Sequence, residues 1–364
     1  MKEWTNAYNP FNSMKVLIWR EHLESIAKQE FLPPVTVDTD PTNQCNYKCI
    51  WCNAFDYMSE DKYTLSEDHL LRLADFYKEW GVYSTCIAGG GEPLLNPALN
   101  SFLERIHKNG IQGGVITNGS LMTNEHVDAI ARMCRWCGFS IDAGTGETYA
   151  LVKGIKDKKF FNKVIENIGK LTKKVGELGT NCDVAFKFLL HPLNALEILQ
   201  AAKLAKSIGV RDFHLRPVGW DNLAVTKYKP PIFFDNLIDD INKQIDAAME
   251  LEDGNFHFYG VRHKFNPQLK RKINFSRCLA SPLLATFGAD GMCHLCFDMR
   301  GRKDLILCSH YPDPREILKV WGSEFHKDMI AKIDITTCPR CTFGPYNEII
   351  EKVFIEDGMC RYFP

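Results

Sequence analysis

Short apolar runs alternate regularly with amphipathic stretches between residues 34 and 218. Six runs rich in β-branched and aromatic residues predict strands, at 34–40, 84–90, 113–119, 137–144, 183–191 and 211–218. Apolar residues at helical spacing predict the helices between them, at 65–80, 97–110, 123–133, 158–179 and 194–209. Strands separated by helices form βαβ crossovers and a parallel sheet. We therefore expect an α/β fold, a partial (β/α)6 TIM-like barrel or curved open sheet rather than a closed eight-stranded barrel.

The remainder of the chain lacks this alternation of predicted strands and helices. Residues 1–34 predict a helical lead-in, and the barrel is expected over 35–225. A helical and basic linker is expected over 226–277, beginning with a helix at 230–253. Residues 278–364 have short segments and many cysteines, which predicts a small separate C-terminal domain.

Composition excludes some classes of function and leaves others. Lys and Arg total 44 against 45 Asp and Glu, a net charge of -1, so nothing favours binding to nucleic acid or a membrane surface. The first residues lack the apolar core of a signal peptide, and no apolar run has the length of a membrane span. We therefore expect a cytoplasmic protein. Its 14 cysteines are many for a reducing compartment, which indicates metal binding or catalysis.

Unusual residues follow the predicted strands at the ends where α/β barrels carry their active sites. In chain order they are CNYKCIWC (45–52), GGGEP (89–93), TNG (117–119), Ser140 with Asp142, Lys187 and Arg216. Because the carboxyl ends of parallel strands share one rim, we expect these residues to gather there.

Three cysteines within eight residues suggest a particular metal site. Each iron of a cube-shaped iron–sulfur cluster needs a ligand beyond its sulfides, and thiolates normally supply all four. Cys45, Cys49 and Cys52 supply only three, which leaves one iron open to a small molecule with an amine and a carboxylate. A zinc knuckle with a distant fourth thiol is the alternative.

The segment CNYKCIWC resembles the radical SAM motif Cys-x-x-x-Cys-x-aromatic-Cys, with Trp51 in the aromatic place. GGEP (90–93) is similar to the methionine-binding strand end of that family, and the resemblance covers roughly 35–218. It implies a 4Fe–4S cluster whose open iron binds S-adenosylmethionine (SAM). One electron then releases a 5′-deoxyadenosyl radical, which takes a hydrogen atom from an unactivated C–H bond. An electron donor such as flavodoxin or ferredoxin is implied.

The resemblance also implies roles for the rim residues. The glycines, including Gly90 and Gly91, let the backbone approach a ligand closely. Glu92 is expected to meet the methionine ammonium through its carboxylate or backbone. The other expected cofactor-binding residues are Ser140 and Asp142 at the ribose hydroxyls, Asn118 at the border of the same pocket, and Trp51 over the cluster and near the adenine. Ser140 and Asp142 could instead simply end their strand. Small buried core positions are expected for Cys86, Cys134, Cys137 and Cys182.

Residues 278–364 resemble the SPASM or twitch extension of some radical SAM enzymes. The resemblance implies one auxiliary 4Fe–4S cluster, on Cys278, Cys296, Cys338 and Cys341, with Cys293 as a rival for the second position. The two-cluster version has further close-set cysteines after CPRC, whereas here only Cys360 follows. A second cluster would need Cys293, Cys308 and Cys360. A zinc ribbon built from Cys293, Cys296, Cys338 and Cys341 is the alternative.

An auxiliary cluster ligated by four thiolates is suited to electron transfer. It favours a two-electron oxidation, such as alcohol to ketone, with Asp298 as the base and His294, His310 or Lys187 as alternatives. Arg216 is the expected substrate anchor, which completes the catalytic candidates Asp298, Lys187 and Arg216. Epimerisation stays open, because a spare cysteine could return a hydrogen atom.

Relatives with this extension act on peptides and proteins or on small polyols, aminocyclitols and sugars. Peptide maturases often carry a leader-binding domain, and the 34 residues before the first strand are too few for one, which favours a small molecule. The basic stretch at 261–277 suggests a phosphorylated substrate, or it is simply a solvated linker. A non-catalytic iron–sulfur or zinc scaffold remains the alternative from another class, although GGEP argues against it.

Overall fold

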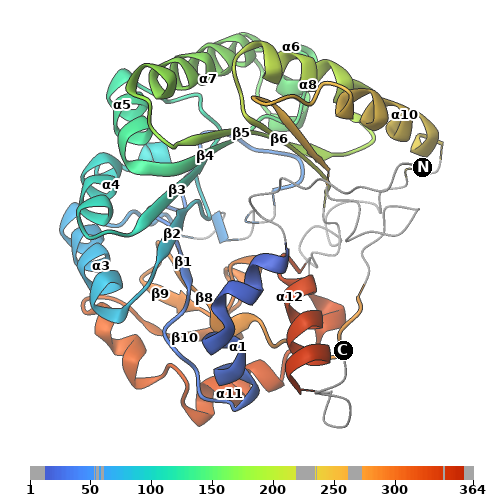
Figure 1. Cartoon of the computed structure of the whole chain (residues 1–364). Coiled ribbons are helices and arrows are strands. Elements are labelled where there is room, and N and C mark those ends of the chain that lie inside the picture. The colour runs from blue at the N-terminus through green and yellow to red at the C-terminus, as the bar shows by residue number, and fades with distance from the viewer. Residues whose placement is uncertain are drawn as a thin grey trace.

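The structure is a computed structural model that describes residues 13–52, 54, 57–58, 61–218, 234, 236–260, 273–338 and 341–355. One curved sheet of ten strands runs through it, in the order β10-β9-β8-β1-β2-β3-β4-β5-β6-β7. Helices line the outside of the curve, and the sheet does not close (Figure 1). The expected α/β fold with a partial TIM-like barrel is therefore confirmed.

Seven parallel strands form the barrel, one more than expected. They are β1 (Thr36–Thr39), β2 (Ser84–Ile87), β3 (Gln112–Thr117), β4 (Cys134–Ser140), β5 (Asp183–Leu190), β6 (Asp212–Pro217) and β7 (His257–Gly260). The first six match the predicted runs, although β4 begins earlier than its run. The assignment of 226–277 to helix and linker alone was wrong, because β7 lies within it. A four-residue strand between polar loops carries too little periodicity to be recognised.

The predicted helices are present, together with helices that the sequence did not predict. They are α1 (Arg20–Ala27), α3 (Glu67–Trp80), α4 (Leu99–Lys108), α5 (Asn124–Met133), α6 (Gly146–Lys153), α7 (Lys159–Leu178), α8 (Ile198–Ser207), α10 (Ile238–Met249), α11 (Glu324–Ala331) and α12 (Gly344–Ile349). At the start of α3 the Ser66 side chain accepts a hydrogen bond from the backbone of His69, which caps the helix. The short α6, α11 and α12 were not predicted. Within the described residues no helix has the length and apolar content to span a membrane.

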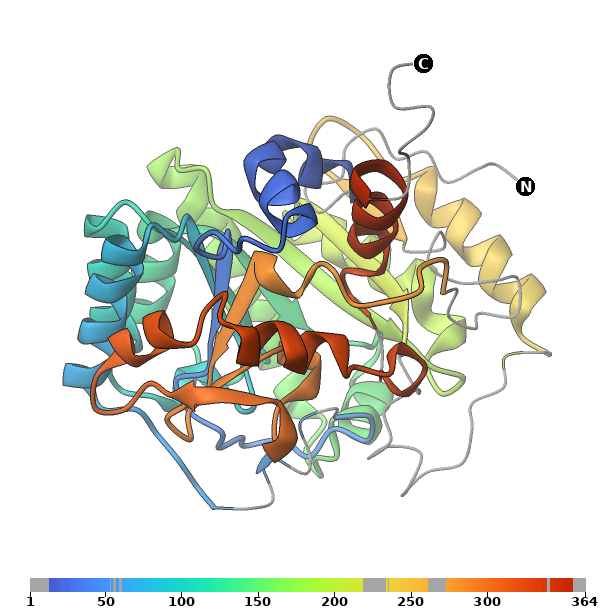
Figure 2. The ribbon, with the colours of Figure 1, turned by 90° about the horizontal axis from the view of Figure 1, so that it is seen from below.

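The C-terminal part of the chain continues the barrel sheet. Strand β8 (Leu284–Phe287) pairs in parallel with β1, so that Thr36 lies opposite Leu284 and Asp38 opposite Thr286. Strands β9 (Met292–His294) and β10 (Ile306–Ser309) follow in antiparallel order. Figure 2 shows β8, in orange, beside the blue β1. The cysteine-rich segment therefore shares its sheet with the barrel rather than forming a separate one.

The two faces of the barrel strands differ in burial. Thr39 and Thr85 face outward, where the Thr39 hydroxyl lies 2.9 Å from both the Tyr77 hydroxyl of α3 and the Thr85 hydroxyl. Alternating positions on the concave face, such as Asp38 and Cys86, stay partly exposed. The same pattern runs along β5 and β6. The concave face is therefore less tightly packed than the outer face, which leaves its polar side chains accessible.

Candidate active site

The loop that carries Cys45, Cys49 and Cys52 follows β1 and is held by backbone hydrogen bonds on two sides. The amides of Lys48 and Ile50 donate to the carbonyls at the end of α6, at 3.1 and 3.0 Å. On the other side, the amide of Glu92 donates to the Gln44 carbonyl at 2.8 Å. The three cysteines are each half-buried. The loop is thus fixed between α6 and the Gly-Gly-Gly-Glu turn after β2.

Two glycines make these close approaches possible. A Cβ at Gly91 would lie 2.2 Å from the Gln44 carbonyl oxygen. At Gly154, which follows α6 with φ of +62°, a Cβ would lie 2.2 Å from the Lys48 carbonyl oxygen. Both obstacles are backbone atoms, so a side chain could be accommodated only by moving the cysteine loop.

The three sulfurs form a donor set that fits a cube-shaped cluster. Burial raises the pKa of Cys45 to about 11 and that of Cys52 to about 12, and it also raises the pKa of Cys49. Deprotonation of these thiols therefore requires a cation, which a cluster iron supplies. In the described residues no three His, Cys, Asp or Glu side chains are placed to hold one metal ion. In a cluster each thiolate binds a different iron.

Glu92 connects the turn after β2 to the end of β3. Its carboxylate accepts hydrogen bonds from the Leu94 amide at 3.1 Å, the Thr117 hydroxyl at 2.5 Å and the Asn118 amide at 2.7 Å. The side chain is only 3% exposed, and burial raises its pKa. The carboxylate thus holds the shape of the turn. Its contact with a methionine ammonium stays a prediction.

Asn118 joins the same rim to the cysteine loop. Its side-chain amide donates to Asn46 at 2.9 Å, and the Asn46 amide in turn donates to the Ser120 hydroxyl at 2.9 Å. Trp51, at the other end of the loop, is buried and stacks on the His191 ring at a centroid distance of 5.0 Å. The predicted site residues of the loop and of β3 are therefore brought together, while their contacts with a cofactor stay predictions.

A buried ion pair beneath the cysteine loop was not anticipated. Asp142 accepts hydrogen bonds from Lys153 Nζ at 2.5 Å and from the Leu189 amide at 2.7 Å. Both charged side chains are only 2% exposed. Burial alone would lower the pKa of Lys153, but the charges of Asp142 and Cys49 outweigh it and raise that pKa. The sequence gives no local signal for this pair, because Lys153 resembles an ordinary basic residue at a helix end.

The contacts of Asp142 bear on its predicted role at a ribose. Both carboxylate oxygens already accept hydrogen bonds inside the protein, and the residue has a left-handed φ of +60°. Ser140 ends β4 opposite Lys187 of β5 and is half-buried on the concave face. Of the two residues, Ser140 is therefore the better placed for a ligand, and its role stays a prediction.

The four predicted auxiliary ligands lie near enough for their charges to act on one another, and their binding of a single cluster stays a prediction. Burial, followed by the charges of Cys341 and Cys338, raises the pKa of Cys278 to about 12. Burial also raises the pKa of Cys296, with contributions from Asp298, Cys278 and Cys341. The Asn347 amide donates to Cys341 Sγ at 3.4 Å, while its oxygen accepts from the amides of Leu279 and Ala280. Asn347 thus ties the CPRC segment to the segment of Cys278.

Cys293 does not belong to this set. On β9 it lies opposite Cys308 of β10, with its side chain wholly buried. The charges of Cys278 and Cys341 act on Cys296, whereas Cys293 lies beside Cys308, which favours Cys296 as the second ligand; the ligand set stays a prediction. Cys360 lies outside the described residues, as does the basic stretch at 261–272.

The cysteines of the barrel differ from the expectation at one position. Cys134, Cys137 and Cys182 are buried in the main core, as predicted. The prediction that Cys86 is also a core residue was wrong. It lies on the concave face of β2, in register with Asp38, and is only partly buried. Sequence could not distinguish the two faces of a four-residue strand.

The candidates for the catalytic base differ in their surroundings. Asp298 is 8% exposed and accepts a hydrogen bond from the Thr342 hydroxyl at 3.3 Å. In contrast, His310 contacts the His69 ring at 2.8 Å through one nitrogen and the Gly288 carbonyl at 2.9 Å through the other. His294 pairs with Asp290 at 3.1 Å. These contacts favour Asp298, and the assignment stays a prediction.

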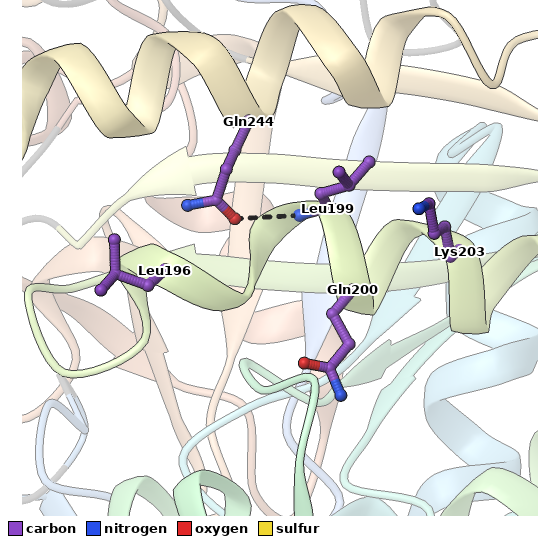
Figure 3. Close-up of a pocket in the computed structure, with 5 residues that line it drawn as sticks. All are labelled: Leu196, Leu199, Gln200, Lys203 and Gln244. Carbon is purple, nitrogen blue, oxygen red and sulfur yellow. Dashed lines mark hydrogen bonds between the residues drawn. The ribbon is translucent and has the colours of Figure 1, made fainter.

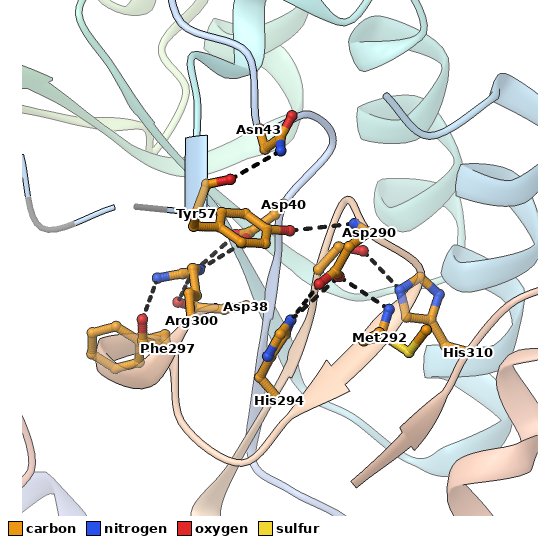
Figure 4. Close-up of polar contacts among 11 residues, drawn as sticks. Asp38, Asp40, Asn43, Tyr57, Asp290, Met292, His294, Phe297, Arg300 and His310 are labelled. Atoms are coloured by element: carbon orange, nitrogen blue, oxygen red, sulfur yellow. Dashed lines mark hydrogen bonds and ion pairs between the residues drawn. The ribbon is translucent and has the colours of Figure 1, made fainter. Parts of the chain in front are cut away.

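Arg300 links the auxiliary cysteines to the barrel rim, a feature that sequence reasoning missed. Its guanidinium binds Asp40 through two hydrogen bonds, at 2.6 and 2.9 Å, and Asp38 at 3.0 Å (Figure 4). Asp40 leads into the cysteine loop and packs against Gly89. Burial raises the pKa of Asp38 to about 6, although Arg300 opposes the shift. The partners are far apart in sequence, so no pattern along the chain could predict the contact.

A shallow pocket lies elsewhere, on the outer surface between α8 and α10. It is lined by Leu196, Leu199, Gln200, Lys203 and Gln244 (Figure 3). Gln244 accepts a hydrogen bond from the Leu199 amide at 3.3 Å, which fixes the two helices together. None of the predicted site residues lines this pocket.

The comparison with known families matches the part of the chain that carries the cysteine loop, the Gly-Gly-Gly-Glu turn and the strand ends. The family model of the Radical SAM superfamily covers residues 39–205. The chain contains a radical SAM domain. Such domains bind SAM and a 4Fe–4S cluster, and the role of Cys45, Cys49 and Cys52 as ligands of that cluster stays a prediction.

Curated relatives of the radical SAM domain have several activities. A probable GTP 3′,8-cyclase of Saccharolobus solfataricus is 27% identical over 192 residues, which are 51% of this chain and 59% of that protein. The subtilosin biosynthesis protein AlbA of Bacillus subtilis is 26% identical over 196 residues, 53% of this chain and 42% of AlbA. The match thus spans less than two thirds of these relatives.

Solved structures share the fold over most of the chain. Streptococcus suis SuiB bound to S-adenosylmethionine has a TM-score of 0.65 at 16% identity, over 93% of this chain and 78% of SuiB. The enzyme anSMEcpe with bound AdoMet has a TM-score of 0.59 at 14% identity, over 88% of this chain and 97% of anSMEcpe. The likeness extends beyond the radical SAM domain into the cysteine-rich part, which agrees with a SPASM or twitch extension.

Proposed function

We propose that this radical SAM enzyme oxidises a small sugar-like or polyol substrate and uses one auxiliary 4Fe–4S cluster as electron acceptor. The observation that supports the proposal is the second cysteine set, Cys278, Cys296, Cys338 and Cys341, whose charges act on one another. Four thiolates complete the ligands of a cluster, which suits it to electron transfer rather than to substrate binding.

The proposed oxidation removes one hydrogen atom, one proton and one electron from the substrate. When bound, SAM and the cluster at Cys45, Cys49 and Cys52 supply a 5′-deoxyadenosyl radical. A hydrogen atom passes from a carbinol C–H bond of the substrate to the deoxyadenosyl carbon. The substrate radical then loses its hydroxyl proton to a base and one electron to the auxiliary cluster, which turns the alcohol into a ketone. The protein positions the substrate and excludes water.

Asp298 is our choice for the base. The charge of Asp298 raises the pKa of two groups. For Cys296 it is the largest contribution after burial, and for Asp38 on the concave face it is a smaller one. Asp298 is therefore close enough to both Cys296 and Asp38 for its charge to act on each. A base at this place would receive the proton on the side where the electron leaves.

A peptide substrate is the second candidate. SuiB has been solved with its precursor peptide SuiA, and anSMEcpe with a peptide. AlbA takes part in bacteriocin biosynthesis. These relatives share the fold or the domain with this chain. Peptides should therefore be tested as substrates together with sugars and polyols.

Iron counting tests the proposal. The chain is purified and reconstituted without oxygen, and iron is measured in the wild type and in a variant with Cys45, Cys49 and Cys52 all changed to Ala. Each 4Fe–4S cluster adds about four irons, so we expect about eight in the wild type and about four in the variant. The wild type, reduced in the presence of SAM, should also form 5′-deoxyadenosine.

Other outcomes would contradict the proposed oxidation or favour a different function. About four irons in the wild type and none in the variant would remove the auxiliary cluster, and with it the proposed oxidation. A chain that forms no 5′-deoxyadenosine would be an iron–sulfur scaffold and not an enzyme of this class. A product at the oxidation level of the substrate, with one carbon-bound hydrogen derived from solvent, would point to an epimerase.

A further inference from the structure

Two cysteines outside both predicted ligand sets face each other near one edge of the sheet. Strand β10 is the terminal strand (Figure 1), and its residue Cys308 lies opposite Cys293 of β9. A bulge produces this register, because β10 advances from Ile306 to Cys308 while β9 advances by a single residue. Regular antiparallel pairing would instead have placed Leu307 opposite Cys293. Bulges re-aim side chains, and this one brings two thiols together.

The register of this pair fits a disulfide. Residues directly opposite on antiparallel strands have Cα atoms about 4.5–5.5 Å apart. A disulfide joins residues whose Cα atoms are about 4.4–6.8 Å apart. Opposite residues also share a face of the sheet, and the Cys293 thiol donates a hydrogen bond to Cys308. A bond between the two sulfurs therefore requires rotation of the side chains and no separation of the strands.

The two thiols differ in exposure and in acidity. Cys308 is partly exposed, whereas Cys293 is 0% exposed, with Phe287 of β8 on one side and Cys308 on the other. The hydrogen bond from Cys293 lowers the pKa of Cys308, although burial and the charge of Glu316 oppose the shift. Burial, and then the same hydrogen bond, raises the pKa of Cys293. Because the thiolate is the reactive form of cysteine, Cys308 is suited to attack an oxidant from solvent.

The pair also encloses a segment that carries candidates for function. Residues 294–307 lie between the two cysteines and include Cys296, Asp298 and Arg300. The Arg300 guanidinium in turn binds two carboxylates of the barrel. A bond between Cys293 and Cys308 would close this segment into a loop, and such a closure restricts the conformations open to it.

We propose that Cys293 and Cys308 form a reversible disulfide, with Cys308 as the attacking thiol and Cys293 as the resolving thiol. The bond holds the ends of segment 294–307 together under oxidising conditions, and a thiol reductant opens it. The inference is independent of the proposed function, because neither step of the exchange uses SAM or a substrate.

The oxidant is a small-molecule disulfide such as oxidised glutathione. The Cys308 thiolate attacks one sulfur of the oxidant, the S–S bond of the oxidant breaks, and one glutathione leaves and takes up the proton that Cys308 lost. Cys293 then loses its proton and attacks Cys308 Sγ in this mixed disulfide. The second glutathione leaves with that proton. Two protein thiols are thus oxidised to one disulfide, and one oxidised glutathione is reduced to two glutathione molecules.

The test uses the full chain, reconstituted with its clusters and kept free of oxygen. The protein is incubated with excess oxidised glutathione, and its remaining thiols are blocked with N-ethylmaleimide under denaturing conditions. Trypsin then releases Cys293 within residues 278–300 and Cys308 within residues 304–315. Mass spectrometry measures the fraction of these peptides that are joined, and fragmentation identifies the cysteines in the bond.

Three variants distinguish the two roles from general thiol reactivity. Cys293→Ser lacks the resolving thiol, so glutathione should stay attached to Cys308. Cys308→Ser lacks the attacking thiol, so neither the joined peptides nor an adduct on Cys293 should form. Cys86→Ser is the matched control, because it removes a partly exposed thiol that lies opposite Asp38 and Gly114 rather than opposite a cysteine.

We expect the bond between Cys293 and Cys308 in most of the wild type and of Cys86→Ser, and we expect dithiothreitol to reverse it. In Cys293→Ser, glutathione should attach to Cys308 at least about tenfold faster than to Cys86. The reason is that one unit of pKa changes the thiolate fraction about tenfold, and burial raises the pKa of Cys86 well above its usual range.

The inference is wrong if the wild type forms no joined peptides, if the bond runs through Cys278 or Cys296, or if Cys86 reacts as fast as Cys308. A bond that forms only after the clusters are removed would make Cys293 a cluster ligand and would also overturn the inference. Iron content shows whether the variants have folded, and if they have not, the wild-type bond and its reversal decide. The proposed function fails separately, through the absence of 5′-deoxyadenosine, which leaves the bond unaffected.

Discussion

Lys153 and Asp142 form an ion pair that is almost wholly shielded from water, directly beneath the cysteine loop. Removal of one partner leaves the other charge buried and unpaired, which typically costs about 3–5 kcal/mol. We expect Lys153→Met to lower the free energy of unfolding by about this amount. Thermal unfolding of the reconstituted protein, followed by circular dichroism, measures the loss.

The double variant Lys153→Met with Asp142→Asn distinguishes two causes of lost stability, the unpaired charge and the changed packing. Because it buries no charge, it should recover a large part of the stability that the single variant loses. If the double variant is less stable than Lys153→Met, the ion pair is not the source of the effect. The backbone contact between Lys153 and Lys48 is present in all of these variants.

Asp212 predicts a specific pH dependence of stability. Burial, and then the charge of Asp183, raises the pKa of Asp212 to about 6, and its Oδ1 has no hydrogen-bond partner in the described part of the chain. The folded protein therefore binds this proton more tightly than the unfolded chain. Protonation of Asp212 therefore raises the free energy of unfolding by up to about 3 kcal/mol. This contribution is complete below about pH 4 and is lost as the pH rises through about 6.

Replacement of Asp212 by Asn should remove this contribution to the pH dependence. Relative to the wild type, Asp212→Asn should gain thermal stability at pH 8 and gain less, or lose, at pH 5. Asp246→Asn, on the exposed face of α10, is the matched control. Parallel pH profiles of wild type and Asp212→Asn would contradict the assignment.

At the scale of elements, the cysteine loop depends on close backbone contact with the turn after β2. We expect Gly91→Ala to push the loop away, because the new Cβ would meet the Gln44 carbonyl at 2.2 Å. The variant should retain about four fewer irons per chain than the wild type. Gly254→Ala, with nothing within 4 Å of its Cβ, should keep the full iron content. Equal iron in both variants would show that the loop tolerates the displacement.

Local patterns predicted the elements but not the contacts between them. Six strands, their helices and the three-cysteine loop could be read from the sequence, because periodicity and spacing act over a few residues. The pairing of Arg300 with Asp38 and Asp40 joins segments some 260 residues apart and has no local signature. The face of β2 to which Cys86 points and the four-residue strand β7 were missed for the same reason, since each depends on neighbouring strands.

At the scale of the whole molecule, β1 is an interior strand only because β8 pairs with it. A chain that ends at residue 277 would lack β8 and leave β1 with one unpaired edge. It would also leave Asp38 and Asp40 without Arg300. Exposed strand edges promote aggregation. We therefore expect the chain of residues 1–277 to be largely insoluble on expression, which the soluble fraction on a gel measures.

A suitable comparison removes a similar contact at the other edge of the sheet. Strand β7 is terminal, so disruption of its pairing by Phe258→Pro leaves the pairing of β1 intact. That variant should keep a larger soluble fraction than the chain of residues 1–277. Equal solubility of the truncated chain and the wild type would show that the radical SAM domain folds without its C-terminal strands.

The pairing of β1 with β8 also has a consequence for biosynthesis. The ribosome makes the chain from its N-terminus at roughly 5–20 residues per second, so β1 waits for tens of seconds before its second partner emerges. During that interval the cysteine loop already exists, next to a strand whose edge is open. Iron and sulfide delivered early would form a cluster in a chain whose sheet still lacks β8. Cluster insertion after release from the ribosome is the order that this topology favours.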